Sequence, residues 1–167
     1  MTEAVDQADA VIFAVWFDAL KDLVTGNAAR LGGKVVIDPS NPVAVGADGR
    51  FSRMLPDGVS AGSVIAGLLP STAHFVKAFG TIAAEKLADA ANRSPERAVL
   101  FYATDDDLAA STAERLISAA GFDPVKAGGL DQAIRIEMFG DLHDFGGLNG
   151  KLVTVGEARG LLAGSAA

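Results

Sequence analysis

The chain has 167 residues, enough for one domain with a real hydrophobic core. Half of the residues are hydrophobic and 21% are charged, which excludes a disordered chain, and the apolar runs are too short for a membrane-spanning helix. The net charge is −7, the 14 lysines and arginines are scattered, and cysteine is absent, so we expect no nucleic-acid partner, no disulfide and no zinc–thiolate site. With no secretory signal in view, these features favour a cytoplasmic protein without a membrane partner.

Apolar runs separated by helical spacings fill the first half of the chain. In chain order they predict a strand at 10–16 that is buried on both faces, a helix at 17–29, a strand at 35–38, a polar loop at 43–59, and a helix that starts at Ser60 or Ser63 and ends at 69. A strand, a helix and a second strand in succession predict a parallel sheet with right-handed crossovers. The second strand, in "KVVIDPSNPV", opens into a turn where a ligand can bind, because ligands of open α/β sheets lie at the carboxyl ends of the strands.

The second half continues the alternation and contains several glycine-rich segments. It predicts a strand at 74–79, a helix capped by Thr81 and ending near 92, a strand at 98–103, a helix from the three aspartates at 105–107 to 120, a strand at 123–127, a helix at 132–139 and a frayed tail at 161–167. The three aspartates are interpreted as helix-start residues rather than a metal site, because capping and the helix dipole stabilise acidic side chains there. We expect a single domain over 1–160 and no metal site.

A glycine-rich phosphate-binding turn is absent from the sequence. Dinucleotide folds carry G-x-G-x-x-G after their first strand, where the glycines allow close approach to the pyrophosphate at a helix N-terminus. The clusters "LGGK", "AGGL" and "FGGLNG" lack this spacing, and no Walker loop occurs. The sequence therefore lacks a recognisable element for holding dinucleotide phosphates.

Five segments of the chain nevertheless occur in an order that resembles a known family. They are "ADAVIFAVWFDAL", "KVVIDPSNPV", "HFVKAFGTIAAEKL", "VLFYATDDDLAASTAERLISAAGFDPVKAGGL" and "DLHDFGGLNG". In this combination the chain resembles the NADP oxidoreductases that depend on the deazaflavin coenzyme F-420, and it is similar to the reductase domain of the STEAP metalloreductases. The resemblance covers nearly the whole chain. It implies hydride transfer between NADP(H) and F-420 or a flavin-like acceptor, on a three-layer α/β sandwich that is part of a Rossmann-like NAD(P)-binding fold.

In that family a first strand, the glycine-rich turn, a helix and a second strand precede the segment that matches residues 5–16. The resemblance therefore implies an amino-terminally truncated member without the first βαβ phosphate-binding unit, which takes roughly 30 residues or more. The strand at 10–16 then becomes an edge of the sheet, and an exposed edge tends to pair with another chain. We expect a homodimer formed through the edge strand at 10–15, or a second polypeptide that supplies the missing half.

The resemblance also implies which turns line the site. The residues implied on the NADP side are Val15, Trp16, Asn41, Pro42 and Ala78, and those on the acceptor side are Phe79, Gly80 and His143. Trp16 and Gly80 depart from the family, in which proline often stands at the first position and asparagine or histidine at the second. No catalytic acid or base is expected, because in hydride transfer the cofactors carry the chemistry and the protein positions the two rings.

Ordinary structural roles are open for the same residues. Val15 and Trp16 can be core and rim packing, Asn41 can close an Asx turn, and His143 can be a salt-bridged surface histidine. An alternative function is also open, namely a non-catalytic remnant or association module that binds NADP weakly alone. Each lost charge-assisted hydrogen bond to the phosphates is worth about 1.5–3 kcal/mol, so losing two weakens binding roughly a hundredfold or more.

Overall fold

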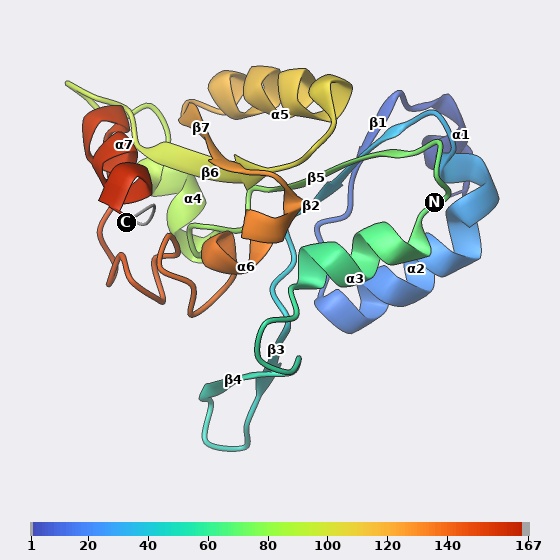
Figure 1. Cartoon of the computed structure of the whole chain (residues 1–167), viewed down its shortest axis with the longest axis horizontal. Helices are drawn as coiled ribbons and strands as arrows, with labels where there is room; N and C mark the ends of the chain where they lie inside the picture. Colours follow the sequence, from blue (N-terminus) through green and yellow to red (C-terminus); the bar gives the residue numbers. More distant parts are fainter. Residues whose placement is uncertain (1, 165–167) are drawn as a thin grey trace.

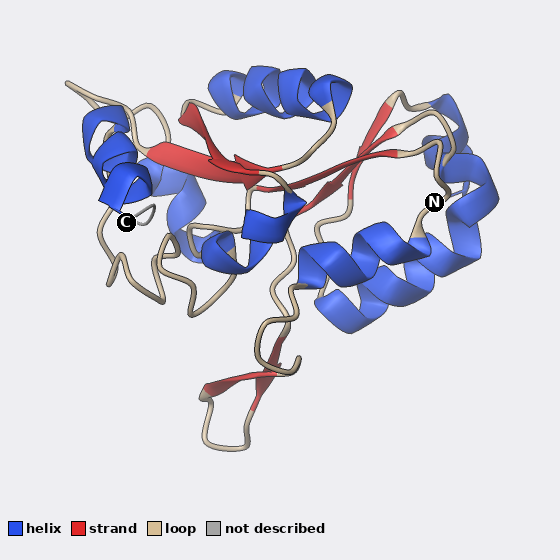
Figure 2. Cartoon of the chain, viewed as in Figure 1, coloured by secondary structure: helices blue, strands red, loops and turns tan. Residues whose placement is uncertain are grey.

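A five-stranded sheet with helices on both faces forms the body of the protein in the computed structural model, which describes residues 2–164 (Figures 1 and 2). The strands are β1 (Ala10–Ile12), β2 (Val35–Asp38), β5 (His74–Ala78), β6 (Val99–Ala103) and β7 (Asp123–Gly128), in the order β1-β2-β5-β6-β7, and a hairpin of β3 (Val43–Val45) and β4 (Phe51–Arg53) stands apart. The helices are α1 (Thr2–Gln7), α2 (Phe17–Leu31), α3 (Ala61–Leu68), α4 (Ala84–Ala90), α5 (Asp107–Ala119), the 3-10 turn η1 (Leu130–Gln132), α6 (Ala133–Ile136) and α7 (Val155–Gly164). The predicted three-layer α/β fold is confirmed.

The sheet is mixed rather than fully parallel. The pairs β1–β2, β2–β5 and β6–β7 are parallel, but β6 runs antiparallel to β5, with Lys77 opposite Ala103. The predicted parallel sheet is therefore confirmed for β1–β2, β2–β5 and β6–β7 and was wrong for β5–β6. The sequence pattern could not reveal the direction of β6, because a strand that is buried on both faces is continuously apolar in either orientation.

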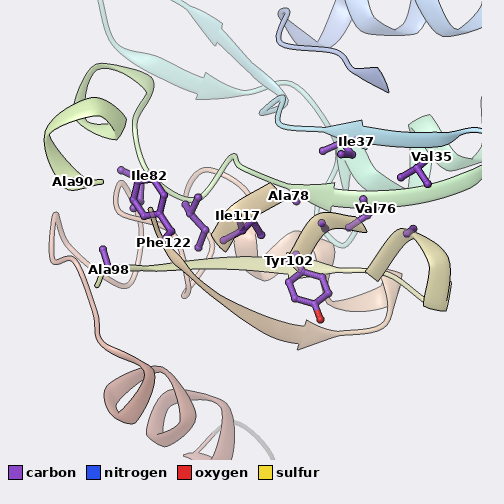
Figure 3. Packing of buried hydrophobic residues seen from close by; sticks show 13 residues of the cluster. Val35, Ile37, Val76, Ala78, Ile82, Ala90, Ala98, Tyr102, Ile117 and Phe122 are labelled. Carbon is purple, nitrogen blue, oxygen red and sulfur yellow. The ribbon is translucent and has the colours of Figure 1, made fainter. Parts of the chain in front are cut away.

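Alternate side chains of the strands point into opposite cores. Val35 and Ile37 face a cluster that includes Ala113 and Ile117 of α5, which covers one face of the sheet (Figures 1 and 3). Val36 points the other way, into a cluster built by α2 and α3. The residues of the first cluster shown in Figure 3 are largely β-branched, aromatic or alanine, which suits a tightly packed strand-on-helix layer.

The predicted strand at 10–16 is shorter and less buried than expected. It ends at Ile12, whose side chain is 45% exposed, because the chain turns when the Val15 amide donates to the Phe13 carbonyl at 2.8 Å. Within the sheet formed by residues 2–164, β1 is an outer strand, as the edge prediction required.

The structure also differs from several other predicted boundaries. The segment predicted as a polar loop contains the β3–β4 hairpin, which projects away from the sheet (Figure 1). Thr81 does not cap a helix, because α4 begins at Ala84 after an Ala83 N-cap. The helix predicted at 132–139 is the short pair η1 and α6 and ends at Ile136. The predicted frayed tail is helical through Gly164, and its last part, 165–167, lies outside the described residues.

Several predicted boundaries were right. Ser60 caps α3 by accepting a hydrogen bond from the Ser63 amide at 3.0 Å, and Asp106 caps α5 by accepting from the Ala109 amide at 2.8 Å. Residues 35–38 form β2 as expected. Among the described residues, no helix has both the length and the apolar character needed to cross a bilayer.

Candidate functional site

The carboxyl ends of the neighbouring parallel strands β2 and β5 deliver two turns to one edge of the sheet. The first turn, 39–42, follows Asp38, and the second, 79–83, follows Ala78. The two turns touch through backbone atoms. A Cβ placed on Gly80 would lie 2.7 Å from the Pro39 carbonyl oxygen, so only glycine fits this close approach without a shift. This edge is the place where open α/β sheets bind their ligands.

Asn41 ties three separate segments together at this edge. Its Nδ2 donates to the Gly80 carbonyl at 3.1 Å, and its Oδ1 accepts from the Met138 amide at 2.6 Å. Both ends of the amide are therefore engaged within the protein. The ordinary Asx-turn interpretation of Asn41 does not describe these bonds, because its partners lie 39 and 97 residues away.

A fully buried ion pair stabilises the first turn. Lys77 on β5 donates to Asp38 Oδ2 on β2 at 2.9 Å and also to the Ser40 carbonyl, and the Lys77 and Asp38 side chains are 2% and 0% exposed. Asp38 Oδ1 in turn accepts from the Ser40 amide at 2.7 Å. Buried charges of this kind must be paired and hydrogen-bonded, so the pair fixes the path of the chain into the turn.

A second buried carboxylate lies close to the first. Glu137 accepts from the Ala61 and Gly62 amides at 3.0 Å each, at the N-terminus of α3. Burial raises the pKa of Glu137, while the charge of Lys77 and the two amides oppose this increase. Glu137 thereby joins α3 to the segment whose next amide, that of Met138, binds Asn41.

His143 and Asp144 form a third polar element of the site. The His143 side chain is 1% exposed, which rules out the surface-histidine interpretation. Its Nδ1 accepts from the Phe145 amide at 2.9 Å and lies 3.2 Å from Asp144 Oδ1. Burial lowers the pKa of His143, while Asp144 and the Gly80 carbonyl oppose the decrease. Within the described part of the chain, Nε2 has no hydrogen-bond partner that meets normal geometry.

Asp144 anchors the loop that carries His143. Its Oδ2 accepts from the Ala83 amide at 3.1 Å and from Lys86 Nζ at 3.2 Å, and the Asp144 amide donates to the Thr81 carbonyl. Lys86 also lies over the ring of Phe145, 5.3 Å from its centroid. The loop is thus attached to the turn that follows β5.

Four buried side-chain polar atoms in or beside these turns lack a hydrogen-bond partner among residues 2–164. They are Ser40 Oγ, Thr81 Oγ1, His143 Nε2 and Asp144 Oδ1. Buried polar groups are normally paired with protein or ordered water, so such a concentration is typical of a site that receives a polar ligand or water. No group of three or more metal-binding side chains occurs in the described chain.

The structure brings some of the predicted site residues together and leaves others apart. Asn41 and Gly80 are in contact, Ala78 is buried at the end of β5, Pro42 is buried after Asn41, and the Gly80 carbonyl faces His143. Phe79 is half-buried and packs against the core beneath α5. Val15 and Trp16 are 37% and 60% exposed.

Trp16 lines an open groove of about 270 Å³ that adjoins the first turn, because the Val43 amide in its lining donates to the Asn41 carbonyl at 2.9 Å. Its other lining residues are Phe17, Asp18, Val43, Ala44, Val45 and Met54. The groove lies between the start of α2 and the β3–β4 hairpin, and the hairpin in turn contacts the histidine loop, with Phe51 and Phe145 edge to face at 6.2 Å.

Several polar residues of the site were missed by sequence reasoning. Asp38, Lys77, Glu137 and Asp144 were not selected, although each is buried. A signal existed for the first two, because a charge within each of two apolar strands must find an opposite charge. No comparable signal identifies Glu137 or Asp144, since the fold brings together their partners, which are backbone amides and, for Asp144, also Lys86.

Comparisons with known proteins agree with this architecture. The hypothetical protein SMa0349 from Sinorhizobium meliloti superposes with a TM-score of 0.73 at 30% identity, over 85% of this chain and 67% of that protein. A putative F-420-dependent NADP reductase from Arthrobacter sp. FB24 gives 0.68 at 22% identity, over 79% and 60%. A pyrroline-5-carboxylate reductase from Coxiella burnetii gives 0.53 at 18% identity, over 84% and 44%.

This chain thus spans less than two thirds of the length of both reductases. No protein-family model matches the sequence, and no curated protein matches it either. The two reductases, at 22% and 18% identity, are similar in fold. The chain has a Rossmann-like α/β fold, and it belongs to the same family as the Sinorhizobium protein SMa0349.

Proposed function

We propose that this chain is an oxidoreductase subunit or domain that takes part in hydride transfer between NADP(H) and F-420 or a flavin-like acceptor. The observation that carries the proposal is the junction of Asn41, Gly80 and the buried His143 at the carboxyl ends of β2 and β5. The fold shared with a putative F-420-dependent NADP reductase supports the same assignment.

The residues at this junction fit the nicotinamide end of NADP. Ala78 and Gly80 lie at the end of β5 beside Asn41, and the buried polar atoms without a hydrogen-bond partner in the two turns and the histidine loop can contact the amide and ribose of the nicotinamide end. Asn41, Pro42 and Ala78, with the Val15–Trp16 turn, form the NADP side, and Phe79, Gly80 and His143 form the acceptor side.

The phosphate end of NADP does not fit equally well. The turn between β1 and α2, "FAVW", contains no glycine, and G-x-G-x-x-G occurs nowhere in the sequence. The nicotinamide cofactor supplies the hydride when it is bound. The contribution of this chain is to orient the reacting ring and to exclude water from the strand-end turns.

The exposed edge favours a second candidate function, association. β1 is an outer strand of the described sheet, and Ile12 and Trp16 beside it are 45% and 60% exposed. Apolar side chains next to unpaired backbone groups favour pairing with another strand. We therefore propose a homodimer through residues 10–15, and the same edge suits a non-catalytic association module.

Calorimetric titration with NADPH distinguishes the two functions. We expect the chain alone to bind NADPH at least about a hundredfold more weakly than a version extended upstream by a βαβ unit with G-x-G-x-x-G. The extended version should also oxidise NADPH with F-420 or a flavin as acceptor. Tight binding by the short chain would remove the association-module alternative, whereas no binding by either form would refute the oxidoreductase proposal.

A further inference from the structure

Two phenylalanine–glycine pairs that lie close to Asn41 in space share an unusual backbone conformation. Phe79 has φ of 69° and Phe139 has φ of 75°, and a glycine follows each of them. Left-handed backbone is uncommon for a bulky residue and is strained unless its surroundings impose it. Such strained residues cluster at binding sites and switches, and the surrounding contacts must hold both turns in place.

Asn41 contacts both strained turns. Its Nδ2 donates to Gly80, directly after Phe79, and its Oδ1 accepts from Met138, directly before Phe139. The glycines leave no space for the turns to relax, because a Cβ on Gly80 would lie 2.7 Å from the Pro39 carbonyl and one on Gly140 would lie 2.3 Å from the Arg135 carbonyl.

We infer that Asn41 is a positioning residue that holds the Phe79–Gly80 and Phe139–Gly140 turns in their strained conformations. It does so with one amide group, whose donor fixes the first turn and whose acceptor fixes the second. The functional consequence rests on the proposed function: a nicotinamide ring can bind between the strand ends only when the two turns are fixed together. Asn41 thus shapes the NADP side of the site by holding the two turns.

The two hydrogen bonds can be separated by substitution. Asn41→Asp keeps an acceptor for the Met138 amide but removes the donor to Gly80, whereas Asn41→Ala removes both. Asn27→Ala is the matched control, because Asn27 also donates its side-chain amide to a backbone carbonyl, that of Leu23 at 2.8 Å in α2, far from these turns.

The experiment records NMR amide exchange of Met138 and the Cβ chemical shifts and HN–Hα couplings of Phe79 and Phe139, which report left-handed backbone. In Asn41→Ala we expect about tenfold faster exchange at Met138 and altered φ-sensitive signals at both phenylalanines. In Asn41→Asp we expect the change at Phe79 alone. Equal changes at both turns in the two variants, or none in either, would overturn the inference.

Titration with reduced nicotinamide mononucleotide, which lacks the adenosine and the pyrophosphate, tests the consequence. If the wild-type chain and Asn27→Ala bind this probe and Asn41→Asp binds it about tenfold more weakly, the positioning role is supported. Unchanged affinity in Asn41→Asp would refute that role. Absence of binding by the wild-type chain would refute the proposed function instead, while the NMR pattern still decides what Asn41 holds.

Discussion

Replacing Lys77 with methionine should destabilise the protein strongly, because it leaves a carboxylate buried without its partner. Lys77 and Asp38 are 2% and 0% exposed, and their charged atoms lie 2.9 Å apart. Methionine retains most of the apolar stem but removes the charge and the donor to Ser40. Breaking a buried pair costs about 3–5 kcal/mol, a large part of the roughly 5–15 kcal/mol that stabilises a typical domain.

Urea unfolding followed by circular dichroism measures this loss. At about 2–4 °C per kcal/mol for a chain of this size, the midpoint of thermal unfolding should fall by roughly 6–20 °C. The double variant Lys77→Met/Asp38→Asn should regain most of the stability, since neither charge then remains buried and unpaired. A loss below about 1 kcal/mol in Lys77→Met, or no recovery in the double variant, would refute the role given to this pair.

Three further predictions concern neighbouring features. Gly80→Ala should cost about 1–3 kcal/mol of unfolding free energy because its Cβ would meet the Pro39 carbonyl. The control Gly67→Ala in α3, where a Cβ meets nothing within 4 Å, should stabilise the protein by about 0.5–1 kcal/mol. Urea unfolding compares the two variants, and equal effects would contradict the close approach of Gly80 to Pro39. Glu137→Gln should leave one α3 amide without an acceptor and cost about 1–3 kcal/mol of unfolding free energy. Because the pKa of Glu137 is raised in the folded state, the stability of the wild-type protein should also fall as pH rises through that pKa. A wild-type pH series without this slope would contradict the raised pKa of Glu137. Partial burial opposes ionisation of Asp106, but the Ala109 amide and His74 leave its pKa lowered. The stabilisation that Asp106 contributes is therefore complete above its unfolded pKa and is lost as pH falls through its folded pKa. Asp106→Asn should make the decrease in thermal stability at acid pH less steep, and an unchanged decrease would contradict this role.

The strands and most helices could be predicted because each depends on local patterns. Residues 35–38 are continuously apolar before the aspartate, and Asp106 precedes a helical spacing, so both were recognised from their neighbours in sequence. The β3–β4 hairpin was missed because its strands are only three residues long and lie among glycine and proline. The direction of β6 was missed because strand burial carries no information on direction.

The site was predicted less completely for a different reason. Asn41 and Gly80 were selected, but their direct hydrogen bond could not be, since 39 residues separate them. His143 was implied on the acceptor side, with a surface position left open because its neighbours are aspartates and glycines, yet the loop packs inward and buries it. The repeated phenylalanine–glycine pairs at 79–80 and 139–140 were visible in sequence, but only backbone geometry shows that both are strained.

Mapping NADPH onto the chain by NMR tests the central claim most directly. Titration of isotope-labelled protein with NADPH should shift the amide signals of residues 39–42, 78–81 and 143–145 together and with one dissociation constant. Those residues carry the strand-end turns and the histidine loop that we propose to hold the nicotinamide. Shifts confined to α1, at the far end of the molecule beside the amino ends of the strands (Figure 1), or no shifts at millimolar NADPH, would contradict the proposed site.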